Sequence, residues 1–512
     1  MQKILTALRP TAIMLALMVL LAATMYAMRE PVNWASYAML TVFYGIVFFI
    51  GAYSQHFKKE DTHEDVLVAG RNIPLWVGLC TMAATWIDGT YINGTAEATA
   101  GTGLIGVQAP WCYAISLIIG GLVFARPMRR GGYTTMLDPI VQKFGQGVGN
   151  IGFITALSGE VFWTAAVLTT LGMTFSTVIH LDYSTSILIS AAITVTYACL
   201  GGLWAVAFTD VFQLVFLFLG LYIAIPFLTA HTGGLEATYT AYCLKMGDKA
   251  AFFPPFSEIT DRKWWTWWDI TFMAILGGIP WQAYFQRVLS ARSENAAVFL
   301  SLGAGVLCLF AAFPPMVIGM VGAITDWTAM GFPAPTSAAS TLPHVIQYLA
   351  PGVLATVLLA VLAAAVMTST DASMVSVSSM WTWNVYLKQI KPTATPADLA
   401  KMLKKALIVV GTASALMAIS LQQVYALWLL CSDFVFCFLF PMLTTALFDK
   451  KANRIGALSG VCVTAILRFG GGEPLFHIPK LIPYAADFPF KTVAMLCGLG
   501  TIIVVSRVFR RD

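Results

Sequence analysis

The chain has 512 residues, of which 58% are hydrophobic and only 11% are charged. A soluble domain carries about 25% charged residues, so this composition excludes an ordinary soluble protein and indicates a chain that lies mostly in a lipid bilayer. The net charge of +5 is too small to favour nucleic acid as a partner.

The cysteines and histidines do not form a recognisable metal or disulfide pattern. Most of the nine cysteines lie in apolar stretches, where they behave as small buried hydrophobes, and only Cys243 falls in a loop. The six histidines are scattered without the spacing of metal ligands. We therefore expect neither a disulfide framework nor a bound metal cofactor.

Hydrophobic runs along the chain predict about fourteen transmembrane helices, because about 20 apolar residues cross the hydrocarbon core. The first run is interpreted as a retained helix, since no convincing signal-peptide cleavage site lies near "YAMREPVN". The predicted spans cover residues 10–28, 34–54, 74–99, 103–125, 149–178, 184–204, 208–229, 267–288, 295–323, 352–381, 404–421, 423–447, 454–470 and 491–508.

Basic residues in the short loops predict the orientation of these spans. Lysines and arginines accumulate in alternate loops, including "RPMRR", the loop at Arg287 and Arg292, and the final "SRVFRRD". Because cytoplasmic loops carry the excess of Lys and Arg, both termini are expected in the cytoplasm of a multi-pass plasma-membrane protein. The longest loop on the opposite side, 230–266, ends in "KWWTWW", which is typical of an aromatic belt at the membrane surface.

Two of the predicted spans carry signals for a break in the helix. The third contains "WIDGTYINGT", and the eighth contains "GGIPWQAY". They lie five spans apart, as expected for transporters built from two inverted repeats whose first helices are broken near the midplane. Two ordinary kinks are the alternative interpretation.

Acidic residues within the spans point to a positively charged ligand. Each costs about 2.5–3.5 kcal/mol at a helix centre, and few Lys or Arg share their depth. Some of them could instead cap broken helices or lie at interfaces, Glu97 and Asp433 first among them. The six acids are Asp88, Glu97, Glu160, Asp269, Asp371 and Asp433.

Hydroxyl groups and aromatic rings accompany the breaks. The tenth span contains "MTSTDASMVSVSS"; its hydroxyls would complete an oxygen shell for sodium if they lay opposite an unwound helix, although such stripes often only hold helices together. Trp86 and Trp281 lie at the two breaks, and Trp163 and Tyr113 lie mid-span. Such rings usually serve packing, but several rings around one cavity would bind a quaternary ammonium group, at about 2 kcal/mol per desolvated cation–π contact.

Longer motifs resemble the sodium-coupled choline transporters of the sodium:solute symporter family over residues 40–507. The resemblance is carried by "TMAATW", "YINGTAEA", "RPMRRGGYTTMLDP", "GEVFW", "LGGIPWQAYFQRVL", "AAVMTSTDASM" and "FPFKT". It implies an all-α, leucine-transporter-like core of five plus five inverted-repeat helices, with flanking helices. The implied units are residues 1–73 (flanking spans), 74–229 (first repeat), 230–266 (extracellular loop), 267–447 (second repeat) and 448–512 (flanking spans).

The resemblance also implies roles for individual residues. The implied sodium ligands are the carbonyls of Ala84, Ile87 and Ala365 and the hydroxyls of Thr368 and Ser369. The implied solute cage is Trp86, Tyr113, Trp163 and Trp281, with the acid Asp269 near it. Where choline transporters have glycines, this chain has Asp88 and Thr90; Asp88 would add a sodium ligand, attract the ammonium group or reshape the pocket for another solute.

We therefore expect a sodium-coupled symporter that imports a small organic cation, choline first. A symporter of the same family for betaine, proline, a carboxylate or a sugar is the alternative. A channel would show unitary currents without accumulation; an enzyme would need a nucleophile and base or a metal cluster, and a sensor would need a signalling domain. The sequence leaves open the dependence on chloride, the sodium stoichiometry and the oligomeric state.

Overall fold

The computed structural model of the chain describes residues 2–27, 32–57, 62–179, 182–335, 337–421, 424–485 and 487–509. These residues form helices and loops with one isolated β-bridge, between Glu473 and Ile478, and no β-sheet, which confirms the all-α class. The long helices are α1 (Gln2–Ala27), α2 (Trp34–Ser54), α9 (Gln146–Ile179), α10 (Tyr183–Ala230), α14 (Glu294–Ile324), α16 (Gly352–Met380), α17 (Pro396–Leu421), α20 (Arg454–Gly470) and α21 (Phe490–Val508).

Shorter helices complete the bundle, several of them as parts of one longer rod. They are α3 (His63–Val68), α4 (Leu75–Trp86), α5 (Gly89–Gly101), α6 (Ala109–Ile119), α7 (Arg126–Arg130), α8 (Asp138–Phe144), α11 (Leu235–Met246), α12 (Arg262–Gly277), α13 (Gln282–Ser290), α15 (Thr341–Leu349), α18 (Val424–Phe434) and α19 (Phe440–Phe448). Single π-helical segments join α6 to α7 (Gly120–Ala125) and α18 to α19 (Val435–Leu439), and a third (Trp381–Ile390) extends α16.

The chain is a multi-pass membrane protein. Ten helices in the described part of the chain are long and apolar enough to cross a bilayer, or eleven if the bent pair His63–Arg71 and Leu75–Trp86 is one span. Fourteen were predicted. The difference arises where a predicted span is broken into two short helices, or where the helix is short, as at Tyr183–Thr196 and α20.

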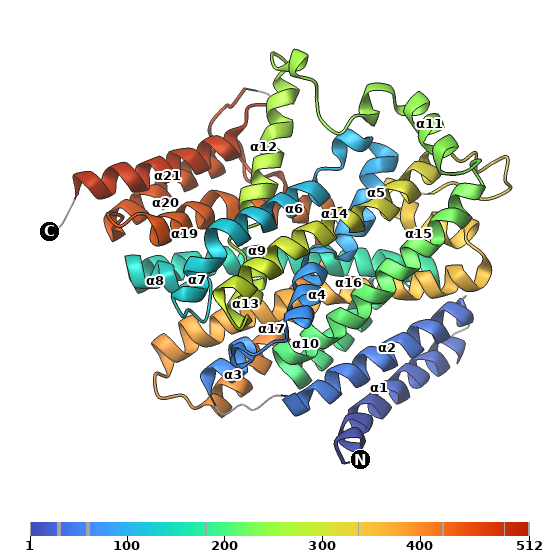
Figure 1. Cartoon of the computed structure of the whole chain (residues 1–512), viewed down its shortest axis with the longest axis horizontal. Coiled ribbons are helices and arrows are strands. Elements are labelled where there is room, and N and C mark those ends of the chain that lie inside the picture. The colour runs from blue at the N-terminus through green and yellow to red at the C-terminus, as the bar shows by residue number, and fades with distance from the viewer. Residues whose placement is uncertain are drawn as a thin grey trace.

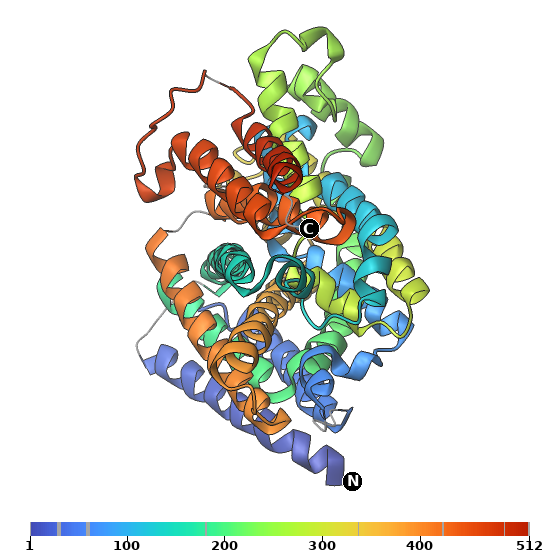
Figure 2. The same cartoon turned by 90° about the vertical axis from the view of Figure 1, so that its left-hand side faces the viewer.

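The termini lie at opposite edges of the bundle, and the two broken helices lie inside it. The pair α1 and α2 packs along one edge, and the pair α20 and α21 along the other (Figures 1 and 2). Between them α9 packs against α16 and α18, and α14 packs against α4, α5 and α6. One hydrophobic core cluster runs through nearly all of these helices.

The first break separates α4 from α5 and follows from local chemistry. Ile87 is non-helical (φ −91°, ψ 69°) and Asp88 is extended, so the helix stops after Trp86. The Asp88 carboxylate accepts a hydrogen bond from the backbone N–H of Tyr91 and so caps the start of α5. Aspartate is a preferred residue at such a cap, and therefore "WIDGT" itself prescribes the interruption.

The second break separates α12 from α13. Pro280 lacks an N–H group and cannot continue a helix, and Trp281 is extended (φ −106°, ψ 135°). A Cβ atom on Gly277 would lie 2.9 Å from the Ser432 carbonyl oxygen, and one on Gly278 would lie 2.5 Å from the Ser116 hydroxyl. The two glycines thus let the end of α12 approach α18 and α6 closely.

Two stretches of the chain show how the predicted spans and loops correspond to the helices. The spans expected at 184–204 and 208–229 correspond to the two parts of α10, which are two helices that meet at a kink at Gly202 (φ 57°, ψ −145°). The loop expected at 230–266 contains α11, and its "KWWTWW" run already belongs to the first turns of α12. Glycine accepts the left-handed φ at the kink without strain, whereas the helical hydrogen bonds on either side persist.

The C-terminal pair α20 and α21 is hydrogen-bonded to two helices of the candidate site, α18 and α12. Arg468 is buried and donates hydrogen bonds to Asp433 on α18 (2.5 Å) and to Glu473 (2.6 Å). Asp269 on α12 accepts hydrogen bonds from the backbone N–H and hydroxyl of Thr492, at the start of α21. Glu473 belongs to the "GGGEP" turn, so this turn covers Arg468. Asp433, which binds Arg468 between α18 and α20, has the interface role considered for it.

Candidate functional site

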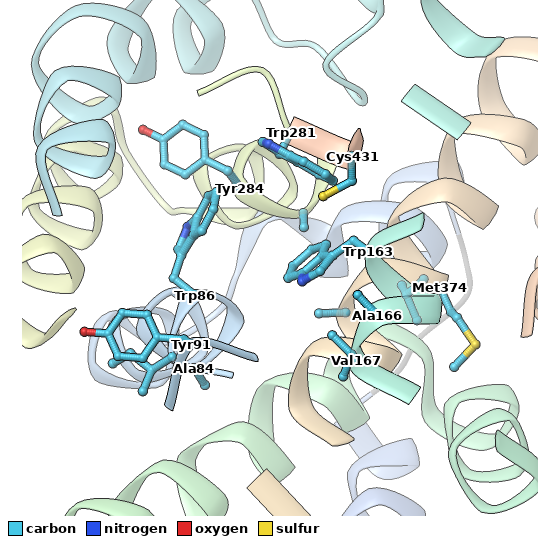
Figure 3. Packing of buried hydrophobic residues seen from close by; sticks show 14 of the residues in the cluster. Ala84, Trp86, Tyr91, Trp163, Ala166, Val167, Trp281, Tyr284, Met374 and Cys431 are labelled. Atoms are coloured by element: carbon cyan, nitrogen blue, oxygen red, sulfur yellow. The ribbon is translucent and has the colours of Figure 1, made fainter. Parts of the chain in front are cut away.

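Four aromatic side chains expected around a solute meet in the interior. The ring centroids of Trp86 and Tyr113 are 4.9 Å apart, those of Trp86 and Trp163 6.4 Å, and those of Trp163 and Trp281 5.3 Å. All four side chains are at most 8% exposed. Figure 3 shows Trp86, Trp163 and Trp281 converging from three separate helical segments. We call these four rings, together with Trp428, the aromatic cage.

Trp428 is the member that sequence reasoning missed. It lies on α18, and its indole Nε1–H donates a hydrogen bond of 2.5 Å to the Tyr113 hydroxyl. A tryptophan within an apolar run such as "YALWLLCSD" carries no local signal, because only packing brings α18 to α6. The cage encloses a cavity of about 10 Å³ that Gly278, Cys431 and Ser432 also line. This volume holds about one water molecule, so the rings must separate to admit a solute.

Asp88 positions one ring of the aromatic cage, Trp163, without lining the cavity. It is 2% exposed and is absent from the residues that line the cavity. One carboxylate oxygen accepts from the Tyr91 N–H and the Thr90 hydroxyl, and the other accepts from the indole N–H of Trp163 at 3.0 Å. The carboxylate therefore fixes the orientation of Trp163 from the N–H edge of its indole ring.

Asp269, the other acid expected near the solute, is engaged elsewhere. Its carboxylate binds Thr492, as described above, and it does not line the cage cavity. The structure thus brings together the four predicted rings but keeps both predicted acids out of direct contact with the enclosed space.

The predicted sodium ligands lie where α16 crosses the first break. The Thr368 hydroxyl donates to the Ala84 carbonyl, and the Ser369 hydroxyl donates to the Thr85 carbonyl, both at 3.3 Å. Ile87 is the non-helical residue at the break. Ala365 lies in α16, within residues 364–367, whose side chains fall outside the described part. Backbone carbonyls and hydroxyls are hard oxygen donors suited to an alkali cation.

Further buried acids surround this oxygen cluster. Asp210 on α10 accepts a hydrogen bond from Thr81, and its carboxylate lies 3.7 Å from the Arg287 guanidinium. Glu160 accepts a hydrogen bond of 2.5 Å from Ser373. Arg287 was assigned to a cytoplasmic loop, which is wrong: it lies in α13 and is only 1% exposed. Its motif "QAYFQRVL" is amphipathic, and the tertiary structure turns the basic residue inward to Asp210.

Another carboxylate, Asp138, organises the opposite end of the bundle. It accepts hydrogen bonds from the backbone N–H groups of Thr134 and Thr135 and from the side chains of Trp383, Asn384 and Lys388. We call these six residues the Asp138 cluster. The rod from Ala109 to Arg130 begins beside the cage and ends at this loop. The cluster therefore joins the loop after α7 to the end of α16.

Comparisons with known proteins agree with this geometry. The model of the sodium:solute symporter family matches residues 67–464, and the chain belongs to this family. It is thus a transporter rather than an enzyme. Its fold is similar to that of a Na+-coupled sialic acid symporter solved in a substrate-bound outward-open state (TM-score 0.79, 19% identity, 93% of this chain and 98% of that chain).

Curated relatives narrow the similarity further. The chain is 40% identical to the high-affinity choline transporter 1 of Caenorhabditis elegans, over 91% of this chain and 84% of that protein. It is 41% identical to the human high affinity choline transporter 1, with the same coverage. It is only 24% identical to the sodium/glucose cotransporter of Vibrio parahaemolyticus, over 91% of this chain and 89% of that protein.

Proposed function

We propose that this chain is a sodium-coupled symporter that imports choline by alternating access. The observation that carries the proposal is the aromatic cage, which is built at both helix breaks and lies directly beside a cluster of hard oxygens. The relatives named as choline transporters, at about 40% identity, support choline as the solute.

The cage has the chemistry for a quaternary ammonium group. Five aromatic rings present π faces and hydroxyl or indole edges, and no lysine or arginine lines the cavity. A trimethylammonium group offers no N–H donor, so cation–π contacts of about 2 kcal/mol each are its main source of affinity after desolvation. The Asp88 carboxylate, at the N–H edge of Trp163, adds a favourable charge without lining the cavity.

Sodium in this proposal is held by the carbonyls of Ala84, Ile87 and Ala365 and the hydroxyls of Thr368 and Ser369. The ion then links α16 to the end of α4, two residues from Trp86 of the cage. Sodium binding at the end of α4 would stabilise the conformation of the broken helix in which Trp86 faces the solute. The binding of sodium and the binding of the solute are thereby coupled. Chloride dependence is left to measurement.

The proposed topology has fourteen crossings, with both termini in the cytoplasm of the plasma membrane. The two broken helices, the first part of α10 and α20 then count as crossings in addition to the ten long helices. The repeats are residues 74–229 and 267–447, with flanking spans before and after. Basic residues around the Asp138 cluster support a cytoplasmic location for that end, because cytoplasmic loops carry an excess of Lys and Arg.

Uptake by proteoliposomes tests the proposal. With an inward sodium gradient and a negative interior, labelled choline should accumulate, and replacing sodium by potassium should abolish the accumulation. The membrane potential contributes about 2.3 kcal/mol per charge for each 100 mV, so dissipating it should lower the accumulation. Absence of sodium-driven choline uptake would contradict the proposal.

Asp88 and Thr90 make the choice of solute worth testing directly. Unlabelled betaine, proline, glucose and a small carboxylate should each compete with labelled choline less than unlabelled choline does. If one of them competes more strongly, the chain is a symporter of the same family for that solute. The hydrogen bonds that the Asp88 carboxylate accepts from Trp163 and from α5 support choline, because they reinforce the cage and do not occupy it.

A further inference from the structure

A second cavity lies next to the aromatic cage. It has a volume of about 350 Å³, which is within the range of small-molecule sites. We call it the vestibule. One face of α5 forms a wall of it, and the start of α6 and residues 106–108 form another. Its lining includes Thr90, Tyr91, Thr95, Glu97, Gln108 and Ala98.

The vestibule and the cage share two side chains. Tyr113 and Trp428 line both cavities, and the hydrogen bond from Trp428 to the Tyr113 hydroxyl joins α18 to α6 between them. A solute in the vestibule therefore reaches the cage when these two side chains separate. Because the closed cage holds only about one water molecule, a solute that enters from this side stays in the vestibule until these side chains move.

Glu97 is the only charged side chain among the residues that line the vestibule. Within the described part of the chain, its carboxylate makes no hydrogen bond or ion pair. Other buried acids near the site are held: Asp88 by three donors, Glu160 by Ser373, and Asp433 by Arg468. Because its carboxylate has no partner in the described residues, Glu97 neither caps a helix nor holds an interface together. A half-buried carboxylate of this kind costs free energy in a membrane helix, so its presence calls for another explanation.

We propose that the vestibule is a first binding subsite for the organic cation, with Glu97 as the group that attracts it. The aromatic faces of Tyr91, Tyr113 and Trp428 provide cation–π contacts, and a carboxylate in a cleft with apolar walls concentrates cations near it. The identity of the cation rests on the proposed choline transport, whereas the location of the subsite rests on this cavity and on Glu97.

The Glu97→Gln variant tests the subsite, since it keeps the shape of the side chain and removes its charge. In sodium-driven uptake, the KM for choline should rise about three- to tenfold while the maximal rate and the sodium concentration for half-maximal uptake stay unchanged. The difference should shrink when inert salt is added, because exposed charges are screened over about 10 Å at 0.1 M. Glu258→Gln, at an exposed acid near the start of α12, should change none of these values.

A chemical probe gives a readout that does not depend on transport. Ala98 lines the vestibule one residue from Glu97. In an Ala98→Cys variant, a cationic thiosulfonate should modify the new thiol several times faster than an anionic one of similar size, as measured by mass spectrometry of the peptide. Choline should slow the modification, and adding Glu97→Gln should remove the preference for the cationic reagent.

The two experiments separate the subsite from the transport function. Equal modification rates for both reagents with Glu97 intact would overturn the subsite, even if choline uptake is robust. The subsite would also be overturned if Glu97→Gln changed the sodium dependence of uptake but left the KM for choline unchanged. Conversely, a preference for the cationic reagent that depends on Glu97 supports the subsite even in a preparation without choline uptake, in which case only the proposed solute has failed.

Discussion

The two ends of the rod Ala109–Arg130 differ in how their polar groups are used. At its start, the vestibule leaves about 350 Å³ of space and a carboxylate, Glu97, without a partner in the described residues. At its far end, Asp138 accepts hydrogen bonds from five donors on two segments of chain. One end is built to receive a ligand and the other is held closed by its own side chains.

This contrast suggests how alternating access is arranged. Between the two ends lies the aromatic cage, which the side chains of Tyr113 and Trp428, joined by a hydrogen bond, separate from the vestibule. The Asp138 end is held by several charge-assisted bonds, including Lys388 at 2.7 Å. The vestibule side therefore has the weaker barrier and the Asp138 side the stronger one.

The largest expected effect comes from Asp138→Ala, which removes the acceptor at the centre of the Asp138 cluster. Losing several hydrogen bonds to a charged group should cost the closed end about 3 kcal/mol, or about 100-fold in the equilibrium between closed and open. Accumulation of choline in proteoliposomes should fall at least tenfold, and its efflux without a gradient should rise.

Asp398→Ala is the matched control for that variant. Asp398 pairs with Lys391 at 2.9 Å on the same side of the bundle, but both side chains are partly exposed, and such a pair contributes little. Unchanged accumulation in Asp138→Ala, at equal amounts of inserted protein, would mean that the Asp138 cluster does not hold this end closed.

Next in size is Trp281→Ala, which acts on the cage between the two ends. Loss of one desolvated cation–π contact costs about 2 kcal/mol, so the KM for choline should rise about 30-fold without loss of membrane insertion. Trp265→Ala, an indole on the exposed face of α12, should leave the KM unchanged. Equal KM values for the two variants would show that Trp281 does not contribute to choline binding.

The double variant Thr368→Ala with Ser369→Ala tests the oxygen cluster. It removes two hard ligands, so the sodium concentration for half-maximal uptake should rise about tenfold, or about 1.4 kcal/mol. At saturating sodium the KM for choline should recover. Thr356→Ala on the exposed part of the same helix serves as the control, and an unaltered sodium curve in the double variant would place the ion elsewhere.

The smallest effect is expected for Tyr113→Phe, which keeps the ring but removes the acceptor of the Trp428 hydrogen bond. One neutral hydrogen bond contributes about 1 kcal/mol, so choline should leave toward the vestibule about fivefold faster. Exchange of labelled choline across the vestibule side measures this rate. Tyr239→Phe, exposed on α11, should have no effect; a Tyr113→Phe rate equal to wild type would show that this bond does not retain the solute.

Sequence reasoning was successful where the decisive interactions are local. Asp88 caps α5 with its own neighbours, and Pro280 forbids a continuous helix through its missing N–H group. The four rings Trp86, Tyr113, Trp163 and Trp281 are not local to one another; the resemblance to a known family gave them as a set, and they do meet. Sequence reasoning could not foresee that Arg287 would lie buried beside Asp210.

The sequence by itself determined that the chain lies in a membrane, where its helices break and which residue types are available for a cation. Hydrophobicity and backbone preference depend on near neighbours along the chain, so they can be read directly. Only the tertiary structure decided that Trp428 closes the cage, that Thr492 engages Asp269 and that Glu97 faces an open vestibule. Those contacts join residues far apart in the chain, and helix packing alone sets the distances between them.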